Sequence, residues 1–119
     1  MLLENKVAVI YGGGGKIGGA AARAFAREGA RVFLAGRTES SLEEVATDIR
    51  SNGGVADISV VDALDESKVN AFVDDVIARA GKLDISFNVI DYRDVQKPLT
   101  GITLDEFEQP IVTATRTQF

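Results

Sequence analysis

The sequence predicts an α/β fold built on a doubly wound parallel sheet. Short apolar, β-branched runs alternate four times with helix-length segments along the 119 residues, the connections are short, and glycines stand at most of the transitions. Successive strands that are separated by helices pair in parallel through right-handed crossovers. The chain is long enough for one domain with a modest core, so we expect a single domain over residues 1–119 with about four strands.

Four consecutive glycines separate the first strand from the first helix. Residues 6–11 form an apolar run typical of a strand that is buried on both faces. The helix after the glycines is expected to end at Glu28, because Gly29 is a suitable C-terminal stop. Its apolar residues recur at helical spacing and predict one buried face, formed by Ile17, Ala20, Ala21, Ala24 and Phe25.

The second strand and helix follow the same pattern. Residues 31–35 are strand-like and Gly36 closes them, and Asn52-Gly53-Gly54 ends the next helix. Thr38, and Ser40 with Glu43 as a capping box, signal the start of that helix. Its predicted buried face consists of Leu42, Val45, Ala46 and Ile49.

The third unit consists of a strand over residues 55–61 and a helix that ends at Gly81. Asp65 is a suitable N-cap for this helix. Its predicted buried face consists of Val69, Phe72, Val73, Val76 and Ile77.

The last third of the chain predicts a fourth strand over residues 83–90, a loop over residues 92–101, and a final helix. Thr103 and Glu106 form a capping box for that helix. Pro110 falls inside it, where proline costs about 3 kcal/mol and predicts a kink or a break.

Composition excludes several classes of function. The 13 basic and 18 acidic residues give a net charge of −5, which argues against nucleic acid or an anionic membrane as a partner. The chain contains no cysteine and no histidine, so it carries no thiolate metal site and no Ser-His-Asp triad, and we predict no metal site. The sequence shows neither a secretion signal nor an apolar run long enough to span a bilayer, so we expect a cytoplasmic protein.

The glycine run indicates a phosphate-binding turn. A pyrophosphate at this point can accept hydrogen bonds from backbone N–H groups at the helix N-terminus, and glycine allows a close approach. Gly13, Gly15 and Gly18 fit the G-x-G-x-x-G spacing of dinucleotide sites, and Gly12, Gly15 and Gly18 fit G-x-x-G-x-x-G. An ordinary glycine-rich turn is the alternative. The candidate cofactor-binding residues of this turn are Gly12, Gly13, Gly14, Gly15, Lys16, Ile17 and Gly18.

Lys16 allows two interpretations. It could place positive charge beside a phosphate, or it could be a solvated residue of the first helical turn. Because a cation at a helix N-terminus is unfavourable without a nearby anion, the electrostatics alone slightly favour the solvated residue.

The end of the second strand favours NADP over NAD. Dinucleotide sites that hold the ribose hydroxyls usually carry an acid here, and this chain has Arg37 instead. A guanidinium can bind a phosphate bidentately and stack on adenine. The alternative for Arg37 is a surface arginine at a helix start.

Two further residues could line the same site. Asp62 follows the third strand and could accept a hydrogen bond from the adenine amino group, or it could simply be a turn residue. Asn88 lies near the end of the fourth strand, where it could bridge strand ends or line the adenosine-ribose side of the cleft.

Taken together, these segments resemble the short-chain dehydrogenase/reductase family over essentially the whole chain. The resemblance is carried by KVAVIYG at residues 6–12, AGR at 35–37, VVD at 60–62, and GKLDI at 81–85 followed by Asn88. It implies a Rossmann fold, a nicotinamide dinucleotide and a small-molecule substrate as partners, and a dimer or tetramer.

The chain also departs from the pattern of that family. The main branch has Thr and Gly where this chain has Tyr11 and Lys16, and Asn-Ala-Gly after the residue that matches Asn88, where this chain has Val89-Ile90-Asp91. A helical asparagine that supports a proton relay in the family matches Ala114.

The resemblance further implies a catalytic serine and a Tyr-x-x-x-Lys motif, in which neither Tyr11 nor Tyr92 stands. We therefore expect no catalytic residue in residues 1–119, and a Rossmann domain that is cut short at its C-terminus. The leading hypothesis is an NADP-dependent short-chain oxidoreductase that transfers hydride between nicotinamide and a carbonyl, alcohol or activated alkene. The alternatives are a non-catalytic dinucleotide-binding module or pseudoenzyme, and a structural fragment that binds nothing.

Overall fold

The computed structural model describes residues 1–91 and 96–119, and the chain divides into two compact units, Met1–Val89 and Ile90–Phe119. The first unit has a four-stranded parallel sheet in the order β3-β2-β1-β4, which confirms the predicted α/β class. In chain order its elements are β1 (Val7–Tyr11), α1 (Lys16–Arg27), β2 (Arg31–Gly36), α2 (Glu39–Ser51), β3 (Val55–Val60), α3 (Glu66–Ala80) and β4 (Ile85–Asn88).

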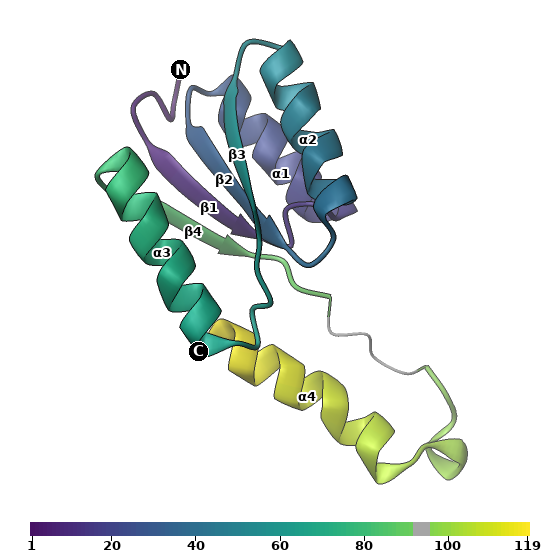
Figure 1. The fold of residues 1–119 in the computed structure, drawn as a ribbon. Helices are drawn as coiled ribbons and strands as arrows, with labels where there is room; N and C mark the ends of the chain where they lie inside the picture. Colours follow the sequence, from purple (N-terminus) through teal and green to yellow (C-terminus); the bar gives the residue numbers. More distant parts are fainter. Residues whose placement is uncertain (92–95) are drawn as a thin grey trace. The chain divides into compact units, whose positions relative to one another are not determined.

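Helices cover both faces of the sheet (Figure 1). Alternate residues of β2 point to opposite faces, so Val32 and Leu34 pack with α1 and α2, whereas Phe33 packs with Phe72 and Val76 of α3. All three of these strand side chains are at most 1% exposed. The sheet therefore has two cores, as a doubly wound fold requires.

The predicted buried face of α1 is wrong in part, although Phe25 does pack against the core. Ile17 is 68% exposed and Ala20 is exposed, whereas the buried residues of the helix are Gly18, Gly19, Ala22 and Ala26. Glycine and alanine occupy seven of the twelve positions of this helix, so apolar periodicity does not mark one side of it. The buried side is instead the one on which glycines allow close packing against the preceding turn.

The buried face of α2 is confirmed, because Leu42, Val45, Ala46 and Ile49 are all buried. The capping box at its start is not. Thr38 is the N-cap and makes no side-chain capping hydrogen bond, and Glu43 binds the Arg50 guanidinium at 3.1 Å instead of capping Ser40.

Helix α3 begins and ends as predicted. The Asp65 side chain accepts a hydrogen bond from the Lys68 N–H, and Gly81 ends the helix with a φ of 79°. Phe72 and Val76 are buried, but Ile77 is 43% exposed, so the buried stripe is narrower than predicted.

Strand β4 is shorter than the predicted run over residues 83–90. Among the described strands it pairs with β1 alone, from Ala8–Ile85 to Tyr11–Asn88, and the pairing ends where β1 turns into the glycines.

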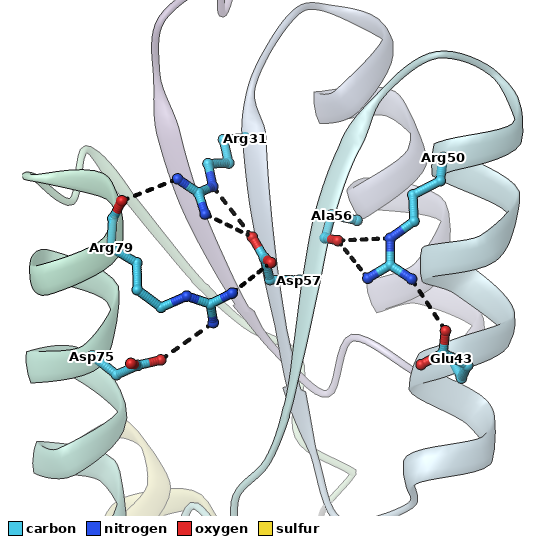
Figure 2. A network of polar contacts seen from close by, with 7 residues as sticks. All are labelled: Arg31, Glu43, Arg50, Ala56, Asp57, Asp75 and Arg79. Atoms are coloured by element: carbon cyan, nitrogen blue, oxygen red, sulfur yellow. Dashed lines mark hydrogen bonds and ion pairs between the residues drawn. The ribbon is translucent and has the colours of Figure 1, made fainter.

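A polar network joins the amino-terminal half of the sheet to the helices (Figure 2). Asp57 on β3 binds Arg31 at 3.1 Å and Arg79 of α3 at 2.7 Å. Both guanidinium groups also lie over the ring of Phe33, at 4.9 and 5.6 Å from its centroid. On the other side of β3, Arg50 donates two hydrogen bonds to the Ala56 carbonyl.

The described part of the second unit contains a 3₁₀ turn, η1 (Leu99–Gly101), and helix α4 (Leu104–Gln118). Thr103 caps α4 by accepting a hydrogen bond from the Glu106 N–H at 3.1 Å, as predicted. The helix continues through Pro110, so the predicted break does not occur there. Part of the predicted loop, residues 92–95, lies outside the described residues.

Among the helices that the structure describes, none is both long and apolar enough to cross a membrane.

Candidate functional site

The carboxyl ends of the four strands place the predicted site residues along one edge of the sheet. Tyr11 pairs with Ala35 of β2 and with Asn88 of β4, and Ala35 pairs with Ser59 of β3. Gly12, Arg37 and Asp62 follow this row by one, two and three residues. In open α/β sheets, ligands bind outside this edge.

The glycine turn begins with a backbone conformation that favours glycine. Gly12 has a φ of 81°, and the N–H groups of Gly12 and Gly13 both donate to the Ala35 carbonyl, at 2.9 and 3.2 Å. The Gly15 N–H returns to the Gly12 carbonyl at 3.1 Å. These bonds fix the turn against the end of β2.

The glycines differ in how much space surrounds them. A Cβ on Gly18 would lie 2.1 Å from the Gly12 carbonyl oxygen, so no other residue fits there. A Cβ on Gly15 would lie 3.4 Å from the same oxygen, which is an ordinary contact. The fold therefore requires glycine at position 18 but not at position 15.

The N-terminus of α1 is open to an anion. The N–H groups of Lys16, Ile17 and Gly18 have no acceptor within the helix, because they precede its first complete turn. The N-cap Gly15 offers no side-chain acceptor, and the first turn contains no acidic residue. The Lys16 side chain is exposed and makes no hydrogen bond or ion pair with any residue that the structure describes.

Arg37 directly follows β2 and is exposed. Its guanidinium makes neither a hydrogen bond nor an ion pair with residues 1–91 or 96–119. Four other arginines of the first unit, Arg23, Arg31, Arg50 and Arg79, are each bound to a carboxylate. The arrangement leaves Arg37 available to a ligand.

Asp62 has the structure of a turn residue. Its Oδ1 accepts a hydrogen bond from the Leu64 N–H at 3.0 Å, and its carbonyl accepts one from the Asp65 N–H at the same distance. An open hollow lies beside this turn, lined by Asp62, Leu64, Asp65, Glu66, Ser67 and Asn70.

Asn88 is half-buried at the end of β4, and the next residue, Val89, donates its N–H to the Tyr11 carbonyl at 2.9 Å. The structure thus joins the ends of β4 and β1 at this residue. Of the two departures beyond Asn88, Asp91 is exposed, and Ala114 is half-buried on α4 in the second unit.

Tyr11 has a packing role in the first unit. Its ring meets the edge of Phe72 with the centroids 5.8 Å apart, and burial raises the pKa of its hydroxyl. The ring thereby links the residue before the glycine turn to α3.

Ser41 is a residue that the sequence did not single out. It lies in the first turn of α2, where its Cβ would be only 2.8 Å from a Cβ on Gly14. Its neighbours in the sequence gave no sign of this contact, because it depends on how α2 packs against the glycine turn.

Comparison with known proteins agrees with this geometry. The profile of the family described as short chain dehydrogenase matches residues 6–115. The uncharacterized oxidoreductase YxbG of Bacillus subtilis is 45% identical over 86 residues, which cover 72% of this chain and 32% of that protein. The 7alpha-hydroxysteroid dehydrogenase of Clostridium sardiniense is 39% identical over 107 residues, covering 88% of this chain and 41% of that one.

Solved structures show the same fold. A NAD⁺-bound xylitol dehydrogenase superposes with a TM-score of 0.90 at 29% identity, over 99% of this chain and 47% of its own. A metagenomic short-chain oxidoreductase in complex with NADP superposes with a TM-score of 0.84 at 30% identity, over 95% and 51%.

The chain thus spans about half or less of the length of these relatives. The family profile covers nearly all of its residues, and both the sheet order and the glycine turn fit that match. The chain belongs to the short-chain dehydrogenase family.

Proposed function

We propose that this chain binds NADP(H) as the cofactor-binding part of an oxidoreductase. A bound nicotinamide supplies or accepts hydride, and the substrate would be a small carbonyl compound, alcohol or activated alkene. The relatives include one structure with NAD⁺ and one with NADP, so the family match supports a nicotinamide dinucleotide. The choice between the two cofactors depends on the residues of this chain.

Arg37 carries the proposal for NADP. It directly follows β2, at a position where an acid would repel a 2′-phosphate, and its two neighbours, Gly36 and Thr38, are not acidic. Its guanidinium is exposed and has no acidic partner among the described residues. A guanidinium in this setting can bind a phosphate through two N–H groups.

The glycine turn supports binding of the pyrophosphate. The open N–H groups of α1 and the positive end of the helix dipole favour an anion at this point. Lys16 adds a charge at the same end of the helix, and an anion there would remove the electrostatic cost of a lysine in the first turn. Gly15 would allow the phosphate to approach the backbone, which explains a glycine where the fold does not require one.

Asp62 and Asn88 would line the adenosine side. The Oδ2 atom of Asp62 takes no part in the turn described above, so this atom would accept a hydrogen bond from the adenine amino group. Asn88 would contact the ribose from the end of β4. No residue is assigned to proton transfer, because neither Tyr11 nor Tyr92 is followed by lysine four positions later.

A titration of the chain with NADPH and with NADH tests this proposal. We expect NADPH to bind more tightly, and Arg37→Ala to weaken NADPH by about tenfold, the usual loss for one hydrogen bond to a charged group. The affinity for NADH should not change. Cofactor fluorescence gives both dissociation constants.

Arg27→Ala is the matched control. Arg27 is also an exposed arginine, but it lies in the last turn of α1, at the end of that helix opposite to the glycine turn. It should leave both affinities unchanged. Equal affinity of the wild-type chain for the two cofactors, or an equal loss in Arg27→Ala and Arg37→Ala, would overturn the NADP assignment. Binding of neither cofactor to folded protein would overturn the dinucleotide site itself.

A further inference from the structure

We infer that the contact between Gly14 and Ser41 sets the spacing between the glycine turn and Arg37, and so determines the preference for NADPH. This inference rests on the proposed function, since it assigns a positioning role within the same cofactor site. It concerns a residue pair that joins the start of α2 to the glycine turn.

The contact leaves no room for a side chain. A Cβ on Gly14 would lie 2.8 Å from the Ser41 Cβ and 3.2 Å from the backbone nitrogen of Leu42. The Leu42 nitrogen is part of the backbone of α2, and the Ser41 Cβ is the first atom of its side chain. Neither atom can move away by rotation of a side chain. Glycine at this position therefore allows the first turn of α2 to lie directly against the glycine turn.

The same turn of α2 is joined to the residues on both sides of Arg37. The Leu42 side chain is 1% exposed, and its Cδ2 lies 3.3 Å from the position of a Cβ on Gly36. The Leu42 N–H donates to the Thr38 carbonyl at 3.3 Å. Displacement of Ser41 and Leu42 would therefore move the backbone that carries Arg37.

The glycine turn cannot readily move in place of α2. Gly12 and Gly13 both donate to the Ala35 carbonyl, and a Cβ on Gly13 would already be 3.0 Å from Leu34 Cδ2. Close packing on this side means that a larger residue at position 14 would push against α2. The resulting shift would fall on Arg37 rather than on the N–H groups of α1.

The two cofactors would respond differently to that shift. Both contain the pyrophosphate that the glycine turn would bind, but only NADPH also carries a 2′-phosphate on the same adenosine. A change in the distance between the turn and Arg37 would disturb the second contact and leave the first. The ratio of the two dissociation constants isolates this effect, because any loss in pyrophosphate binding is common to both.

Gly14→Ala is the test, measured by titration with NADPH and NADH. We expect the preference for NADPH to fall by about tenfold, the size of one lost hydrogen bond to a charged group. Adding Ser41→Gly removes the Cβ that is crowded most, so the double variant should recover most of the preference. Ser41→Val enlarges the same contact from the side of α2, and it should also lower the preference for NADPH. It therefore serves as the test if Gly14→Ala does not fold.

Gly54→Ala is the matched control for a general disturbance of α2. Its Cβ would lie 2.7 Å from Ile49 Cγ2, near the C-terminus of α2. The substitution therefore crowds the end of the helix and makes no contact with its first turn. The cofactor ratio should stay at the wild-type value in this variant.

The outcomes separate this inference from the proposed function. If Arg37→Ala abolishes the preference for NADPH but folded Gly14→Ala and Ser41→Val keep it, the proposed function stands and the inference is overturned. An equal change of the ratio in Gly54→Ala would also overturn it. If the wild-type chain shows no preference, the proposed NADP specificity fails before the positioning role is reached.

Discussion

Charged side chains at the two ends of the parallel sheet differ in whether they have partners within the fold. At the amino end, Asp57 is shared by Arg31 and Arg79, and Asp84 accepts from the Val7 N–H at 2.8 Å and binds Lys82 at 3.0 Å. At the carboxyl end, Arg37 and Lys16 are exposed and have no polar partner in the described part of the chain. Asp57 and Asp84 thus hold parts of the fold together, whereas Arg37 and Lys16 are exposed, as the proposed cofactor site requires.

The N-termini of the helices also differ in whether a side chain caps them. Helix α3 starts with a capped N-terminus at Asp65, and α4 starts with one at Thr103. The N-termini of α1 and α2, which follow β1 and β2, have no capping side chain. Open N–H groups beside unpaired cations cost stability in an empty site and gain favourable contacts with an anion.

The largest expected effect comes from Gly18→Ala. Because its Cβ would lie 2.1 Å from the Gly12 carbonyl oxygen, the helix must shift away from the turn. We expect a loss of about 3 kcal/mol in the free energy of unfolding, at the upper end for overpacking, together with loss of cofactor binding. Chemical denaturation and titration with NADPH measure the two effects.

Gly101→Ala is the control for Gly18→Ala, because no heavy atom of the described residues lies within 4 Å of a Cβ at position 101. Its free energy of unfolding should match the wild-type value. Unchanged stability in Gly18→Ala would mean that the close approach of α1 to the turn is not needed.

Asp57→Ala tests the amino end. The carboxylate is 20% exposed and its two arginine partners are 33% and 41% exposed, so solvent screens the interaction in part. We expect the free energy of unfolding to fall by about 1–2 kcal/mol, with the NADPH-to-NADH ratio unchanged.

Asp48→Ala removes a more exposed partner, that of Arg23 on α1, and should cost less than about 0.5 kcal/mol. A change in the cofactor ratio in Asp57→Ala would contradict the division between the two ends.

Gly15→Ala tests the carboxyl end without disturbing the fold. Its Cβ has an ordinary contact distance of 3.4 Å and Gly15 has a φ of −81°, so the free energy of unfolding should change by less than about 0.5 kcal/mol. We expect both NADPH and NADH to bind about tenfold more weakly, because a methyl group would stand where the phosphate approaches. Unchanged affinity for both would show that the phosphate does not approach this residue.

Much of the fold could be predicted because its sequence signals are local. Leu42, Val45 and Ile49 of α2 stand among charged residues, so their periodicity marked the buried face correctly. In α1 the same periodicity marked the wrong side in part, because alanines occur all around the helix and its buried side includes Gly18 and Gly19 beside Ala22 and Ala26. Apolar periodicity treats glycine only as a turn residue, so it does not predict a buried helix face that contains glycines.

The site could be predicted in part for the same reason. The glycine turn and Arg37 follow strands and Asn88 ends one, so their common edge follows from parallel pairing alone. The contact of Gly14 with Ser41 and the sharing of Asp57 by two arginines join residues that are more than 20 positions apart. Such contacts depend on tertiary packing, for which a single sequence gives no local signal.

The smallest expected effect concerns the pH dependence of the amino end. The hydrogen bond from the Val7 N–H, followed by the one from Lys82, lowers the pKa of Asp84 below its ordinary value of 3.8. A carboxyl group whose pKa is lower in the folded state stabilises the fold above the pKa of the unfolded chain, and this contribution is lost as the pH falls through the folded pKa. Asp84→Asn should therefore be less stable than the wild type near neutral pH, and the difference should shrink below a pH of about 4. Thermal unfolding of the two proteins across the acidic range measures it, and a difference that stays constant with pH would show that the charge of Asp84 does not contribute.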